Sequence, residues 1–113
     1  MAERNYFING ITELLILSIL YMRDSYVYEI TKTIENDSNG LLCISQNTIY
    51  TATYKLQSEG KISEYSQLVG KKRTRVYYHI EPSGIDYLNE LKQNYQNTIS
   101  GVQSIVDSLT NQT

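Results

Sequence analysis

The chain has 113 residues, 41% of them apolar, and a formal net charge of −2, which is enough material for one domain with a modest core. It lacks the run of about 18 apolar residues that a membrane-spanning helix needs. The single cysteine, Cys43, excludes a disulfide within the chain. With only one histidine, His79, the chain has few residues for a metal site or a Cys–His nucleophile pair, and no enzyme motif occurs. We therefore expect a cytoplasmic protein that is not an enzyme and has no metal or cofactor, with Cys43 as a small buried residue.

The charge is unevenly distributed along the chain. Residues 55–75 hold six cationic and two acidic side chains, a net charge of +4, which leaves −6 for the remainder. A basic segment on an acidic body is typical of a surface that contacts phosphates. Charge runs in turns are more often simply solvated, so this pattern alone does not decide the function.

Two helices are predicted after a short polar arm, residues 1–9. The strongly apolar segment Gly10–Met22 predicts a helix buried on more than one side, which in so small a domain indicates that a second subunit covers part of it. Asp24 or Ser25 is expected to cap a second helix from Tyr26 to Glu35. The core stripe of this second helix is predicted to be Val27, Ile30, Thr31 and Ile34.

A third helix is predicted to begin after Ser45, its N-cap, and to stop at Gly60. Its buried face is expected to carry Ile49, Ala52 and Leu56, which recur at helical spacing. The other face carries side chains that can hydrogen-bond base edges or phosphates in a major groove. These side chains belong to Gln46, Asn47, Tyr50, Thr51, Tyr54 and Lys55.

Two strands around a turn at Gly70 are expected next, with Lys71, Lys72, Arg73 and Arg75 at or just beyond the turn. The second strand alternates, so Val76, Tyr78 and Ile80 are predicted to face the core, and His79 to be a surface residue. A short polar-faced helix followed by a hairpin with a cationic tip is the layout of a winged helix-turn-helix. We assign it to residues 10–81.

Residues 82–113 are predicted to form a long final helix, with Pro82 in its first turn. Its apolar residues recur at intervals of three and four, which makes a seam for another helix. A two-fold homodimer is the simplest explanation, and folding back along its own domain is the alternative. The expected fold class is therefore mainly α with a small β-hairpin (α+β), a winged helix-turn-helix followed by a dimerisation helix. Dimer contacts are expected from Leu14, Leu17, Leu88, Leu91, Tyr95, Ile99, Val102, Val106 and Leu109.

Four segments, in order, carry a family resemblance. Residues 11–20 (ITELLILSIL) resemble an opening helix, and residues 26–30 (YVYEI) resemble a Tyr-Gly-Tyr-Glu-Ile signature. The third segment resembles a Thr-Leu-Tyr…Leu…Gly reading helix, with residues 48–50 (TIY), Leu56 and Gly60. The fourth is similar to a basic wing with a double tyrosine, with residues 73–78 (RTRVYY) and Gly84. From about Gly10 to Leu109 the sequence thus resembles the PadR family of bacterial transcriptional regulators.

The resemblance implies a dimeric winged-helix repressor of the compact branch, which binds an inverted repeat. Some members of that branch resemble multidrug sensors that hold flat aromatic compounds between their terminal helices. By position, Tyr95 would be the aromatic residue at such a site, where those sensors have a tryptophan and this chain has none. The resemblance thus allows a small aromatic ligand as an effector. Val27 and Asn47 replace expected glycines and Thr51 a frequent proline, which bears on the operator that is read.

The expected partner is therefore double-stranded DNA, with two reading helices per dimer entering successive major grooves roughly 34–36 Å apart. The alternative is a winged-helix protein-interaction module without DNA binding, which the acidic overall charge permits. Expected DNA contacts are Tyr28, Lys32, Ser45, Gln46, Asn47, Thr48, Tyr50, Thr51, Tyr54, Lys55, Lys71, Lys72, Arg73 and Arg75.

Overall fold

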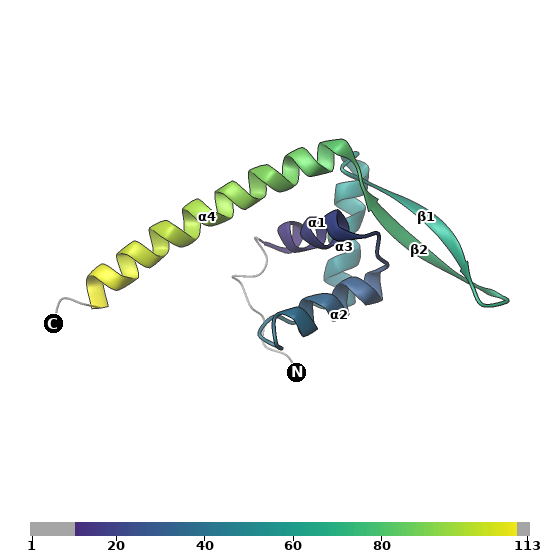
Figure 1. Cartoon of the computed structure of the whole chain (residues 1–113), viewed down its shortest axis with the longest axis horizontal. Coiled ribbons are helices and arrows are strands. Elements are labelled where there is room, and N and C mark those ends of the chain that lie inside the picture. The colour runs from purple at the N-terminus through teal and green to yellow at the C-terminus, as the bar shows by residue number, and fades with distance from the viewer. Residues whose placement is uncertain (1–10, 111–113) are drawn as a thin grey trace.

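The computed structural model describes residues 11–110, which form four helices and one two-stranded antiparallel sheet (Figure 1). The predicted fold class is confirmed, whereas the predicted arm at residues 1–9 lies outside the described residues. Within residues 11–110, no helix is both long and apolar enough to cross a membrane. The elements are α1 (Thr12–Met22), α2 (Val27–Asp37), α3 (Gln46–Ser58), β1 (Ile62–Val69), β2 (Arg73–Ile80) and α4 (Pro82–Thr110).

The core is built around α1, which contacts α2, α3, α4 and β2. Its residues Ile16, Leu17 and Leu20 are almost completely buried, as expected for a helix that is apolar nearly all round. Its neighbours, however, are elements of its own chain. Leu17 is 0% exposed and Leu88 is 3% exposed, so these two expected dimer contacts lie in the core of a single chain.

Local sequence signals set the ends of α3 and α4. The Ser45 side chain accepts a hydrogen bond from the Thr48 backbone N–H at 3.2 Å, which confirms the predicted N-cap. Thr53, rather than Ala52, is fully buried on the inner face of α3. The final helix begins at Pro82, as expected.

The predicted cap of α2 is wrong. Tyr26 is its N-cap residue, with no side-chain capping bond, and Ser25 is buried, with its hydroxyl donating to the Arg23 carbonyl at 3.3 Å. Cys43 is also exposed rather than buried. In the short segment before α3 only Ile44 points fully inward, so its neighbour Cys43 faces out.

The hairpin pairs Ile62 with Ile80 at its base and Val69 with Arg73 at its tip. Gly70 turns the chain with φ of 72°, a left-handed conformation that suits glycine. Tyr78 and Ile80 are buried as predicted, but Val76 is 41% exposed because the outer part of the hairpin extends beyond the helices (Figure 1).

The first turns of α4 pack on the body, and the rest of the helix projects away from it, in a direction different from the hairpin (Figure 1). Gly84 allows the first turn of α4 to pack closely against the base of the hairpin. A Cβ there would overlap the Lys61 carbonyl oxygen and lie 2.9 Å from Ile80 Cγ1. The base of α4 is thus fixed against the hairpin, while its C-terminal half is exposed.

Candidate nucleic-acid interface

The outward face of α3 presents polar side chains to solvent. Gln46, Asn47, Tyr50, Thr51 and Tyr54 are all exposed, and Tyr54 is 76% exposed. Within residues 11–110, the side chains of Gln46 and Asn47 have no hydrogen-bond partner, whereas the Thr51 hydroxyl donates to the Asn47 carbonyl at 3.0 Å. The first turn of α3 therefore offers free amide groups, the side chains that can pair with adenine edges.

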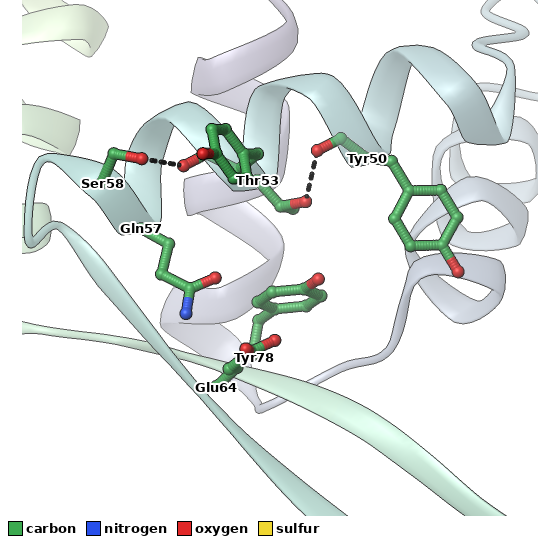
Figure 2. Close-up of a pocket in the computed structure, with 7 residues that line it drawn as sticks. Tyr50, Thr53, Gln57, Ser58, Glu64 and Tyr78 are labelled. Carbon is green, nitrogen blue, oxygen red and sulfur yellow. Dashed lines mark hydrogen bonds between the residues drawn. The ribbon is translucent and has the colours of Figure 1, made fainter.

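A groove of about 570 Å³ lies between α3 and the hairpin (Figure 2). A second hollow of about 320 Å³ shares Tyr50, Glu64 and Tyr78 with it and extends to Tyr28 and Arg75. The outer face of α3, the start of α2 and the hairpin therefore form one continuous surface. Sequence reasoning did not single out Glu64, an acidic residue on this otherwise neutral or basic surface. The larger groove is lined by Tyr50, Thr53, Tyr54, Gln57, Ser58, Glu64 and Tyr78.

The hairpin tip carries Lys71, Lys72 and Arg73, all exposed. Arg75 differs from them, because its guanidinium carbon lies 4.4 Å from the centroid of the Tyr26 ring. A cation stacked on an aromatic face is held in place by the ring quadrupole. Tyr26 was not predicted to take part, since only the folded chain brings it beside the hairpin.

The hairpin is fastened to the loop between α1 and α2 through Asp24. The Tyr65 hydroxyl donates to Asp24 Oδ2 at 2.8 Å, and His79 Nδ1 lies 2.8 Å from Asp24 Oδ1. Burial raises the pKa of Asp24, but its hydrogen bonds to His79 and Tyr65 outweigh this, so the pKa lies below its ordinary value. His79 is exposed, which confirms its assignment to the surface.

Two predicted DNA contacts lie on the outer side of α2. Tyr28 is 51% exposed, and the Lys32 ammonium lies 5.6 Å from the centroid of its ring. At the start of α3, Ser45 and Thr48 are exposed but engaged with each other, their hydroxyl oxygens 2.9 Å apart. These residues border the surface that α3 and the hairpin form.

Lys55 lies apart from the other predicted DNA contacts. Its Nζ is 3.4 Å from Glu13 Oε2, so the side chain is directed at α1 although it remains 60% exposed. The structure therefore brings together the first turns of α3, the start of α2 and the hairpin, and pairs Lys55 with an acidic residue that the sequence did not single out.

The predicted dimer residues divide into two groups. Leu14, Leu17 and Leu88 belong to the core of the single chain and Leu91 is partly buried against it, whereas the apolar side chains from Tyr95 onward form an exposed stripe on α4, with Val102 at 54% exposure. Ile105, which is 62% exposed, adds to this stripe and was not predicted. A hollow of about 530 Å³ between α1 and α4 is lined by Ile11, Leu14, Leu91, Asn94, Tyr95, Thr98, Ile99 and Val102.

A sequence model of the PadR-like family of transcriptional regulators matches residues 16–90. The chain belongs to this family. Its members are transcriptional regulators, not enzymes. Among residues 11–110, no cluster of three or more His, Cys, Asp or Glu side chains could hold a metal ion.

The chain is also similar to individual proteins. An uncharacterised protein from Lysinibacillus sphaericus is 31% identical over 104 residues, which cover 92% of each chain. The structure of a transcriptional regulator from Clostridium thermocellum is similar with a TM-score of 0.83 and 32% identity, over 93% of this chain and 99% of that one. Bacillus subtilis PadR, solved in complex with operator DNA, shares the fold with a TM-score of 0.66 and 24% identity, over 71% of this chain and 45% of that one.

Proposed function

We propose that this PadR-like chain is a homodimeric, sequence-specific DNA-binding repressor that occupies an inverted-repeat operator. The observation that carries the proposal is the exposed first turn of α3, where Gln46 and Asn47 are free to bond, beside a hairpin with a cationic tip. The fold is the one in which Bacillus subtilis PadR was solved with operator DNA. An exposed polar helix beside a basic wing suits a major groove and its flanking phosphates.

Different parts of this surface have different tasks. Gln46 and Asn47, with Tyr50 and Thr51, meet base edges and choose the sequence. The exposed cations at the hairpin tip contact phosphates or the flanking minor groove, which supplies affinity without sequence choice. Tyr28 and Lys32 on α2 add backbone contacts.

The dimer is formed through the exposed apolar stripe of α4 and the adjoining hollow between α1 and α4. This stripe runs along the part of α4 that leaves the body, where the side chains remain 38–66% exposed. A second copy covers it by two-fold symmetry, so that each stripe buries the other. Occupying a promoter with this dimer blocks transcription.

Release of the operator is assigned to a small aromatic ligand at the dimer centre. Tyr95 lines the hollow between α1 and α4 and is 38% exposed there, so a flat ring can stack on it. A ligand releases DNA only if it binds better to a dimer whose reading helices are mis-spaced.

Fluorescence-anisotropy titration tests the proposal, with the chain's own upstream region and a scrambled duplex at two salt concentrations. Tight, salt-sensitive binding that prefers the native fragment supports a repressor acting on its own gene. Equal binding to both fragments would indicate that the operator lies outside this upstream region. No binding at low salt overturns the proposal and favours a protein-interaction module docked through α4.

A further inference from the structure

One partly buried carboxylate connects three helices. Glu13 on α1 is 18% exposed, and its Oε1 accepts a hydrogen bond from the Tyr87 hydroxyl of α4 at 2.7 Å. Its Oε2 is shielded from solvent, has no hydrogen bond within residues 11–110, and lies 3.4 Å from Lys55 Nζ on α3. The Lys55 ammonium is therefore the charge that compensates this oxygen.

The partner on α4 is itself held in place. The Lys61 ammonium, which pairs with Glu59 at 2.9 Å, lies 4.0 Å from the centroid of the Tyr87 ring. The hydrogen bond to Glu13 and burial raise the pKa of Tyr87 to about 12, so its hydroxyl remains a donor at neutral pH. The base of α4 is thus connected to α1 and to the chain that leaves α3.

These three helices have different tasks in the proposed dimer. The face of α3 reads DNA, the far end of α4 meets the second copy, and α1 lies between them. The angle between α3 and α4 therefore fixes the distance between the two reading helices of a dimer. A buried carboxylate is costly unless paired, so a shift of α3 against α4 that separates Glu13 from either partner is penalised.

We propose that Glu13 is a positioning residue for DNA reading, which holds α3 at a fixed angle to the dimerisation helix by binding Lys55 and Tyr87 together. The inference rests on the proposed function and adds to it the contact that transmits the geometry of α4 to the reading helix. It also gives Lys55 a role other than a phosphate contact. The ammonium compensates Glu13, and it orients α3 instead of neutralising the DNA backbone.

The two roles of Lys55 differ in a measurable way. A lysine that contacts phosphate contributes about 0.9 to the slope of log affinity against log salt concentration, and its loss weakens all sequences equally. A lysine that only positions α3 leaves this slope unchanged, and its loss reduces the preference for the correct sequence.

The experiment uses a duplex that the full-length protein selects from a randomised pool, and a scrambled version of it. Anisotropy titrations over a series of salt concentrations compare the protein with K55Q, E13Q, Y87F and the double variant E13Q/K55Q. Asp37→Asn and Lys92→Gln are matched controls, since both residues are exposed and the charge changes are the same. Circular dichroism confirms that each variant is folded. Because Lys55 is 60% exposed, K55Q is the variant least able to disturb the core.

We expect K55Q, E13Q and Y87F each to lower the ratio of selected to scrambled affinity roughly two- to fivefold, the effect of one such ion pair or hydrogen bond. K55Q should keep the salt slope of the wild type. The double variant should have the same affinity ratio as either single variant, because both substitutions remove the same contact. The control variants should have the affinity ratio of the wild type. Two results overturn the positioning role. The first is a salt slope that K55Q lowers by about 0.9, with an equal loss of affinity for both duplexes. The second is a ratio of selected to scrambled affinity that is unchanged in all variants. A wild-type protein that selects no duplex and binds none at low salt instead refutes the proposed function, and the positioning role with it.

Discussion

Substitution of Val102 by glutamate tests the dimer stripe of α4. Val102 is 54% exposed in the single chain, so about half of its side chain remains to be buried by a second copy. Full burial of such a side chain is worth about 1.5–3 kcal/mol, which gives roughly 1 kcal/mol per subunit and 2 kcal/mol per symmetric dimer. A carboxylate enclosed in an apolar contact adds at least about 2 kcal/mol. The dimer dissociation constant should therefore rise about a thousandfold.

Sedimentation velocity over a series of protein concentrations measures this change. The matched control is Ser104→Glu, because Ser104 is exposed and lies two residues on, about 200° round the helix from Val102. We expect the control to remain dimeric and V102E to be monomeric at micromolar concentration, with an unchanged helical circular dichroism spectrum. A V102E protein that sediments as the wild-type dimer would refute the assignment of this face.

Further substitutions test the reading surface, the hairpin anchor and the base of α4. Asn47→Ala should change which duplexes are preferred, whereas Arg73→Ala should weaken all duplexes alike and lower the salt slope by about 0.9, both measured by anisotropy. The lowered pKa of Asp24 stabilises the fold above the ordinary value of 3.8, and this stability is lost as the pH falls through the lower folded pKa. Asp24→Asn should therefore lose less stability than the wild type between neutral pH and about pH 3 in urea titrations. Gly84→Ala should destabilise the chain by about 1–3 kcal/mol through its clash, whereas Gly101→Ala, with nothing within 4 Å of its added methyl, should stabilise it by up to about 1 kcal/mol.

Each of these expectations has a clear counter-result. Equal effects of the alanine substitutions at Asn47 and Arg73 on all duplexes would remove the distinction between sequence choice and phosphate contact. An Asp24→Asn variant as acid-sensitive as the wild type would show that this carboxylate does not contribute. Equal stabilities of the two glycine variants would contradict the close packing at Gly84.

Local rules were sufficient to predict most of the fold. The hydroxyl of Ser45, the fixed φ of Pro82 and the turn at Gly70 each act through their nearest neighbours in the chain, so the sequence alone placed the start of α3, the turn of the hairpin and the start of α4 correctly. The predicted alternation of β2 was wrong only at Val76, where the body of helices ends and the strand continues.

Contacts between distant segments could not be predicted in this way. Asp24 had been expected to cap α2, but the hairpin supplies Tyr65 and His79 as partners from more than 40 positions away in the chain. Lys55 belonged by spacing to the outer face of α3, and only the packing of α1 against α3 reveals Glu13 beside it. The exposure of the polar face of α3 was predictable because the helical period sets which side chains point away from the core, although Thr53 rather than Ala52 is the residue buried on the inner face.

In the proposed complex, two copies of α3 read one inverted repeat. Hydroxyl-radical footprinting of the full-length protein on its selected duplex tests it most directly. We expect two protected segments related by two-fold symmetry, with centres about 10–10.5 base pairs apart or a multiple of that distance. A single protected segment, or no protection at a salt concentration that permits binding, would contradict it.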